Sequence, residues 1–211
     1  MDLGRAKESE AMNGAPQARR GGNTRQRIQD VALGFFLERG YEKTSLREVA
    51  DELGISKPAV YYHFKTKEDI LVGLLGDVGR ELDALIAWGR EQPRTLESKR
   101  ELLARYSVIF DNAAPLFRIM QQNIATLSEL TVGQEFTDRT TALAALLKDA
   151  DAPMAAQVRC VSALLTLHFG TFALEYIDGA AEDKRLALLD SATELLTSAY
   201  AVQETADGPA A

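Results

Sequence analysis

The segment from Thr44 to Phe64, TSLREVADELGISKPAVYYHF, constrains the fold more than any other part of this 211-residue chain. Ala50 is small, so two short helices can pack closely around it. Gly54, four residues later, can adopt the positive φ that a tight turn between those helices requires. Val60, six residues further on, is apolar and can fill the space between them. This spacing predicts a helix-turn-helix.

Capping signals predict where the helices around this turn begin. Asn23 and Gln26 have the spacing of a capping box, and so do Ser45 and Glu48. Thr66 is a suitable N-cap for a following helix. We therefore expect helices at about 24–39, 45–53 and 57–64, and the start of a fourth near residue 67.

The rest of the chain also has the pattern of helices, with no alternating β-branched run long enough for a sheet. The expected ranges are 67–89, 96–111, 114–130, 134–149, 154–178 and 182–203. The expected breaks lie near Pro93, Pro115, Gly133, Pro153 and Gly179. We predict an all-α fold, with disordered tails at 1–22 and 204–211.

The third helix is expected to have one buried and one exposed face. Val60 and Phe64 lie four residues apart and face the core with Ile55. Tyr61 and Tyr62 are then left outside, although an isolated aromatic pair is more often partly buried. An exposed face of this kind is suited to the major groove, because tyrosine reaches phosphates and thymine methyls. The residues expected on or beside it are Lys57, Ala59, Tyr61, Tyr62 and His63.

The charge of the chain is divided unevenly. The net charge is −7, yet residues 19–67 carry ten Lys and Arg against six Asp and Glu, while residues 68–211 carry twelve against twenty-two. A basic N-terminal block on an acidic body is expected where only that block meets a polyanion. The alternative is that the charges are scattered unevenly by chance. The charge division by itself is therefore weak evidence for nucleic-acid binding, and it only adds to the evidence from the helix-turn-helix motif.

Composition narrows the class of protein further. The single cysteine, Cys160, excludes an intramolecular disulfide and a cysteine-based zinc site, and it is expected to be a small buried residue. No signal peptide or membrane span is apparent, so we expect a cytoplasmic protein with no metal and no cofactor.

Residues from about 24 to 75 resemble the DNA-binding domain of the tetracycline-repressor (TetR) family. The matching runs are Ala32–Phe36 with Gly40-Tyr41, then 44–50, 53–56, 60–64 and 67–71. The resemblance implies a DNA-binding domain at 23–70 and a ligand-binding and dimerisation domain at 71–203. It implies DNA contacts by Ser45, Arg47, Lys57, Ala59, Tyr61, Tyr62, His63 and Lys67, the last to phosphate.

The resemblance also implies a homodimer on an inverted-repeat operator, with repression as the default. The helices at 154–178 and 182–203 carry apolar stripes broad enough to pair with a second subunit. An inducer pocket is a family expectation, and a mostly apolar or aromatic ligand is expected because aromatics outnumber buried charges. Its candidate lining is Trp88, Tyr106, Phe110, Phe117, Met120, Gln121, His168, Phe169, Phe172 and Tyr176. His168 has an alternative role as a hydrogen-bonded core residue.

Two alternatives to a regulator are disfavoured by the sequence. An enzyme is disfavoured because His63 and His168 are the only histidines and no phosphate loop, zinc-helix or nucleophile-elbow motif occurs. A module that binds only protein through its helix-turn-helix is disfavoured because Lys57, Tyr61 and Lys67 are expected on one exposed side.

Overall fold

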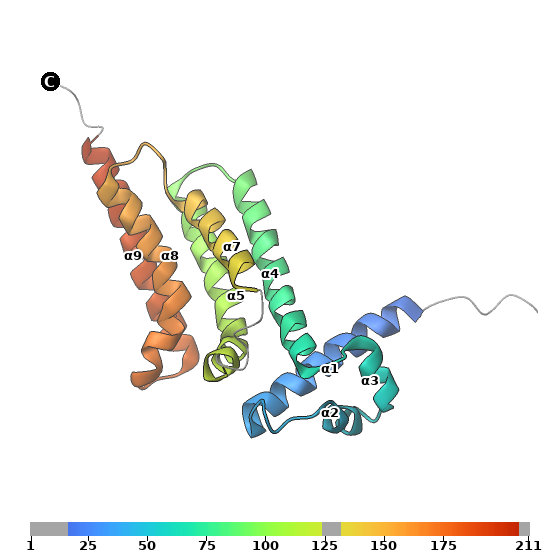
Figure 1. The fold of residues 1–211 in the computed structure, drawn as a ribbon. Helices are drawn as coiled ribbons and strands as arrows, with labels where there is room; N and C mark the ends of the chain where they lie inside the picture. The colour runs from blue at the N-terminus through green and yellow to red at the C-terminus, as the bar shows by residue number, and fades with distance from the viewer. Residues whose placement is uncertain (1–16, 124–131, 207–211) are drawn as a thin grey trace, which may run out of the picture.

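The computed structural model describes residues 17–123 and 132–206, and all of the regular elements in these ranges are helices. This confirms the all-α prediction. In Figure 1 the three N-terminal helices gather at one end of α4, and the remaining helices form a bundle beside its other end. The elements are α1 Gln17–Arg39, α2 Leu46–Leu53, α3 Lys57–His63, α4 Lys67–Glu91, α5 Leu96–Gln122, α7 Val132–Leu147, α8 Met154–Ala173, the 3₁₀ turn η1 Leu174–Tyr176, and α9 Ala181–Ala206.

Two capping boxes start helices where the sequence predicted a helix start. The Glu48 N–H donates to Ser45 Oγ at 3.3 Å, and the Ser45 N–H donates to Glu48 Oε2 at 2.9 Å. At the start of α4, Thr66 and Asp69 make the equivalent pair at 3.1 and 3.0 Å. Each box satisfies backbone N–H groups that a helix start would otherwise leave without an acceptor.

The first helix begins earlier than predicted. It starts at Gln17, so Asn23 lies inside α1 and the expected tail boundary at residue 22 falls within the helix. Residues 17–20 are good helix formers, and each of the two glycines after them costs only about 1 kcal/mol relative to alanine. The expected tails at 1–16 and 207–211 lie outside the described residues, and α9 continues to Ala206.

One predicted break is absent. The helix α5 continues through Pro115, because Leu116 and Ile119 beyond the proline are as deeply buried as Ala113 before it. This burial outweighs the single backbone hydrogen bond that an interior proline removes. Gly133 lies in the first turn of α7, so a helix begins close to the predicted break, and the residues before it, 124–131, lie outside the described part of the chain. The breaks near Pro93, Pro153 and Gly179 are confirmed, and α8 ends at Ala173 because the chain tightens into η1.

Two hydrophobic clusters share α4. Its first turns bring Ile70, Leu71 and Leu74 into a cluster with α1, α2 and α3. Its later turns bring Leu82 and Leu85 into a second cluster with α5, α7, α8 and α9. The end of α5 also reaches the first cluster, through Leu116 and Ile119. Both α4 and α5 therefore connect the helix-turn-helix to the bundle through buried side chains.

The helices α8 and α9 lie side by side along the edge of the bundle (Figure 1). Gly170 permits part of this close packing, because a Cβ there would lie 2.3 Å from Leu188 Cδ2. Within the described residues, no helix is both long enough and apolar enough to cross a membrane.

Candidate nucleic-acid interface and cavity

The turn between α2 and α3 has the geometry that its sequence predicted. Gly54 has φ 64° and ψ 30°, in the left-handed region that favours glycine. The Ile55 N–H donates to the Ala50 carbonyl at 3.1 Å and closes the turn. Ala50 and Val60 are fully buried at the contact between the two helices. The predicted roles of the small residue, the glycine and the apolar plug are confirmed.

The helix α3 presents its tyrosines to solvent. Tyr62 is 82% exposed and Tyr61 is 45% exposed, whereas Val60 and Phe64 are buried. This excludes the alternative in which the two tyrosines belong to the core. The edge of the Tyr62 ring packs against His63, with centroids 5.2 Å apart.

The other predicted contact residues lie on or beside this surface. Lys57 is exposed at the first turn of α3, and Ala59 is half-buried. Arg47 is exposed and only loosely paired with Asp51, at 3.8 Å. Ser45 is exposed, but its hydroxyl already bonds to Glu48. In this structure the Ser45 hydroxyl therefore caps the start of α2.

Lys67 is engaged within the protein. Its ammonium donates to the Tyr41 carbonyl at 3.0 Å, pairs with the Glu42 carboxylate at 3.4 Å, and lies 4.2 Å from the Tyr41 ring centroid. Its side chain is only 20% exposed. These contacts tie the start of α4 to the segment after α1, and the phosphate contact expected of Lys67 stays a prediction.

Arg25 on α1 is a cation that the sequence analysis did not select. Its guanidinium lies 4.3 Å above the Phe64 ring centroid and donates to the His63 carbonyl at 3.4 Å. It is therefore held beside the end of α3 while it stays exposed. The sequence feature that could have indicated Arg25 is the basic start of the first helix, where Arg25 and Arg27 lie close together.

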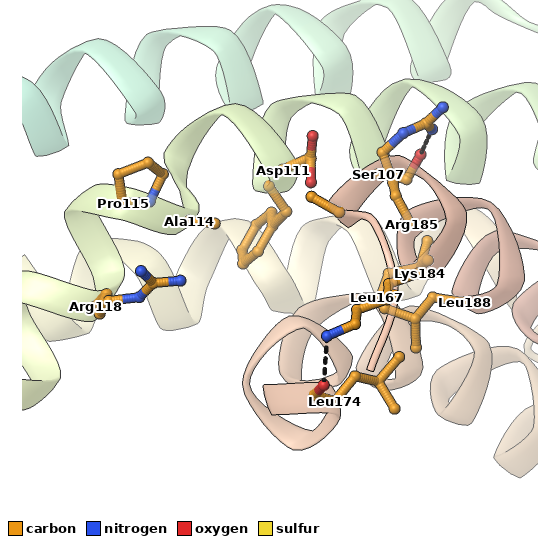
Figure 2. A pocket seen from close by; sticks show the side chains of 13 residues that line it. Ser107, Asp111, Ala114, Pro115, Arg118, Leu167, Leu174, Lys184, Arg185 and Leu188 are labelled. Atoms are coloured by element: carbon orange, nitrogen blue, oxygen red, sulfur yellow. Dashed lines mark hydrogen bonds between the residues drawn. The ribbon is translucent and has the colours of Figure 1, made fainter. Parts of the chain in front are cut away.

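A cavity of about 680 Å³ lies between α5, the end of α8 and the start of α9 (Figure 2). Of the nine predicted ligand residues whose side chains the structure describes, only Phe110 lines it. Its lining is Ser107, Phe110, Asp111, Ala114, Pro115, Arg118, Leu167, Leu174, Gly179, Ala181, Lys184, Arg185 and Leu188.

Several of the predicted ligand residues form an aromatic cluster behind the cavity. Tyr106 Oη and His168 Nδ1 are 2.7 Å apart, and the Phe110 ring lies 4.5 Å from Tyr106 and 4.7 Å from His168. Phe117 stacks on Phe110 at 5.2 Å. Burial lowers the pKa of His168, so its imidazole is favoured in the neutral form. His168 is therefore half-buried and hydrogen-bonded to Tyr106, in line with its alternative role.

The remaining predicted ligand residues lie apart from the cavity. Trp88 lies under the Arg105 guanidinium at 4.1 Å, and Met120 packs on the N-terminal cluster. Gln121, Phe169 and Tyr176 are exposed. The side chain of Phe172 is outside what the structure describes.

The outer face of α8 and α9 carries exposed apolar side chains. Phe169 is 57% exposed and Val158 is 54% exposed, with Leu165 on the same helix and Leu186 on α9. Isolated exposed apolar residues are common, but a row along two adjacent helices is typical of a subunit interface.

The N-terminal part of the chain matches a known family. The model of bacterial regulatory proteins of the tetR family matches residues 28–74. The chain is 36% identical over 78 residues to the HTH-type transcriptional repressor KstR2 of Rhodococcus jostii, covering 35% of this chain and 38% of that protein. It is 34% identical over 82 residues to the transcriptional activator FasR of Mycolicibacterium smegmatis, covering 38% of this chain and 36% of that protein.

Solved structures resemble the chain over most of its length. The TetR-family regulator PfmR of Thermus thermophilus has a TM-score of 0.61 at 24% identity, covering 80% of this chain and 97% of that one. A transcriptional regulator of Aquifex aeolicus has a TM-score of 0.61 at 21% identity, covering 79% and 96%. The chain spans 38% and 36% of the length of these two curated relatives, whereas the likeness to the two solved structures extends over about four fifths of the chain.

Proposed function

We propose that the chain is a DNA-binding transcriptional regulator of the tetR family rather than an enzyme, because the model of bacterial regulatory proteins of that family matches residues 28–74. The observation that carries the proposal is α3, which exposes Lys57, Tyr61 and Tyr62 while Val60 fixes it against α2. A short helix held in this way can enter the major groove and present side chains to base edges.

The DNA contacts divide by chemistry. The hydroxyls of Tyr61 and Tyr62 reach phosphate, and their ring edges reach thymine methyls. Lys57 and Arg47 supply positive charge next to the groove, and Arg25 adds another at the end of α3. Phosphate contacts of this kind position the protein, whereas the base contacts of α3 select the sequence.

The regulator acts as a homodimer in this proposal. The apolar face of α8 and α9, which includes Val158, Phe169 and Leu186, meets the same face of a second copy across a two-fold axis. Two α3 helices about 34–36 Å apart then fit successive major grooves, and the operator is an inverted repeat.

Release from the operator follows ligand binding in the bundle. The helix α4 is the lever, since Leu71 belongs to the N-terminal cluster and Leu82 to the bundle cluster. The end of α5 is a second link, because Pro115 lines the cavity while Leu116 is buried against the N-terminal domain. A ligand that favours one spacing of the two domains shifts the population away from the DNA-competent state. We further propose that the protein represses transcription, that its inducer is mostly apolar or aromatic, and that it works in the cytoplasm.

The test is binding of the full-length protein to DNA from upstream of its own gene, measured by fluorescence anisotropy at several salt concentrations. Unlabelled unrelated DNA is the competitor. Binding that resists the competitor and weakens steeply with salt is expected of a specific regulator. Binding equal to that of the competitor at every salt concentration would contradict an operator in that region.

Two variants that each remove one positive charge test whether the surface around α3 binds DNA or only another protein. Lys57→Gln is expected to lower affinity for all DNA sequences and to reduce the salt slope by about 1. Lys148→Gln, at the far end of the bundle, is the matched control and is expected to leave both unchanged. An unchanged salt slope in Lys57→Gln would remove Lys57 from the interface.

A further inference from the structure

The ammonium group of Lys184 lacks a carboxylate partner at the wall of the cavity. Its Nζ donates to the backbone carbonyl of Leu174 at 3.1 Å, and no carboxylate of the described residues lies within ion-pair distance of it. The Lys184 side chain is half-buried. A neutral carbonyl satisfies one donor but leaves the charge uncompensated, and a partly desolvated cation is stabilised by an anion that enters beside it.

The other charged groups that line the cavity differ in how far their charge is already compensated by a partner. Arg185 already pairs with Glu182 at 2.6 Å and donates to Ser107 Oγ at 3.1 Å, so its charge is largely compensated. Arg118 lies on α5 beside Pro115, away from Ser107 (Figure 2). Among the lining residues that the structure describes, Asp111 is the one carboxylate. Because Arg185 is compensated by Glu182, Lys184 is the cation of this wall that is left without a carboxylate partner.

The rest of the wall is apolar. Phe110 on α5, Leu167 on α8, Leu174 on η1 and Leu188 on α9 supply its apolar side chains, and the Leu167 and Leu188 side chains lie beside Lys184 in Figure 2. A volume of about 680 Å³ lies within the range of small-molecule sites. The cavity thus combines an apolar body with a positively charged edge.

We infer that this cavity binds an amphipathic anion, with its carboxylate or phosphate group on Lys184 and its apolar part against Phe110, Leu167 and Leu188. This inference rests on the proposed regulator function and refines its ligand class, because the sequence alone indicated only an apolar or aromatic molecule. A neutral molecule of the same shape lacks the attraction to Lys184.

Three probes with the same ten-carbon chain test the ligand class: decanoate, decyl phosphate and 1-decanol. Each is titrated below its aggregation limit into the DNA-free, full-length protein, and binding is measured by isothermal titration calorimetry. At least one anion is expected to bind about 10-fold more tightly than the alcohol, as for a hydrogen bond to a charged group. The tighter anion identifies the head group as carboxylate or phosphate. Equal binding of all three probes, or no binding, would overturn the inference.

Lys184→Met tests the residue, because methionine keeps most of the aliphatic stem and removes the charge. It is expected to lose the preference for the anion, about 10-fold, while 1-decanol binds as before, which shows that the cavity is intact. Lys184→Arg keeps the charge and is expected to keep the preference. Lys148→Met, a half-buried lysine outside the cavity, is the matched control. An undiminished preference in Lys184→Met would overturn the assignment.

Direct titration keeps this result separate from the regulator proposal. If the protein fails to bind an operator but still prefers the anion at Lys184, the regulator proposal fails and the cavity assignment stands. If it binds an operator but shows no preference for the anions, the cavity assignment fails alone.

Discussion

The phenol of Tyr106 and the imidazole of His168 share a hydrogen bond of 2.7 Å that joins α5 to α8. The Phe110 ring packs against both groups and also lines the cavity. The bond satisfies two polar groups in a buried aromatic environment, where leaving either without a partner is unfavourable. Tyr106 and His168 therefore support the cavity from behind.

Tyr106→Phe is expected to lower the free energy of unfolding by about 1–3 kcal/mol, because it leaves the buried His168 ring nitrogen without its partner. Urea denaturation measures the change. His168→Phe in the same background is expected to recover part of the loss, since removing both polar partners leaves none unsatisfied. A loss below about 0.5 kcal/mol in Tyr106→Phe would mean that water replaces the phenol.

Asp149 holds a nearly buried cation. Lys99, only 4% exposed, lies 2.9 Å from one Asp149 oxygen, and Arg94 lies 2.9 Å from the other. Burial raises the pKa of Asp149, but the hydrogen bonds from Lys99 and Arg94 outweigh it and lower the pKa below its usual value. Asp149→Asn is expected to lower the free energy of unfolding at pH 7 by about 2–3 kcal/mol.

The difference between the wild-type protein and Asp149→Asn has a defined pH dependence. The native pKa is lowered, so the stabilisation is present above the unfolded value of about 3.9 and is lost as pH falls through the native pKa. Thermal melts from pH 7 to pH 3 measure it. Asp51→Asn, which removes an exposed pair with Arg47, is the control and is expected to change stability by less than about 0.5 kcal/mol. A difference that persists unchanged at pH 3 would contradict the ionic explanation.

Gly54→Ala isolates the backbone requirement of the turn. No heavy atom lies within 4 Å of a Cβ placed there, so the expected loss of about 1–2 kcal/mol comes from the positive φ alone. Gly54→Asn is expected to lose less, because asparagine tolerates this conformation. Gly34→Ala inside α1 also meets no atom within 4 Å and is expected to stabilise the protein by up to about 1 kcal/mol. Equal effects of the two alanine substitutions would contradict this reasoning.

Tyr62→Ala is expected to reduce operator affinity about 10-fold while it changes the free energy of unfolding by less than about 0.5 kcal/mol. The reason is that 82% of the Tyr62 side chain is exposed, so the folded protein makes little use of it. Fluorescence anisotropy and urea denaturation give the two values. Tyr176→Ala, at a tyrosine that is 94% exposed on η1, serves as the control that is expected to retain full affinity. Retention of affinity in Tyr62→Ala would exclude this side chain from the DNA interface.

Phe169→Glu is expected to convert the proposed dimer to a monomer, because it places a charge in the apolar face of α8 and α9. Sedimentation velocity at several protein concentrations measures the state, and operator affinity should fall with dimerisation. Leu37→Glu, an exposed apolar position on α1, is the control and is expected to leave the dimer intact. A dimer that survives Phe169→Glu at micromolar concentration would place the interface elsewhere.

The sequence predicted the helix-turn-helix well because its determinants lie close together in the chain. The pairing of Ser45 with Glu48 acts over three residues, and the turn at Gly54 closes onto Ala50. Proline and glycine were less reliable as signals: Pro115 lies within α5 because burial on both sides of it outweighs one missing hydrogen bond. Aromatic residues also did not predict the lining of the cavity. Tyr106 and Phe117 both pack against Phe110 instead of lining the cavity.

The sequence by itself determined the all-α class, the order of the helices and the exposed face of α3, since these depend on capping, periodicity and a turn formed by neighbouring residues. Only the tertiary structure decided where the cavity lies and which charges line it. Arg185 and Ser107 are 78 residues apart in the chain and meet because α9 packs against α5. The contacts of Lys67 and Arg25 likewise depend on tertiary packing, because the neighbours of a long flexible side chain come from segments far away in the sequence.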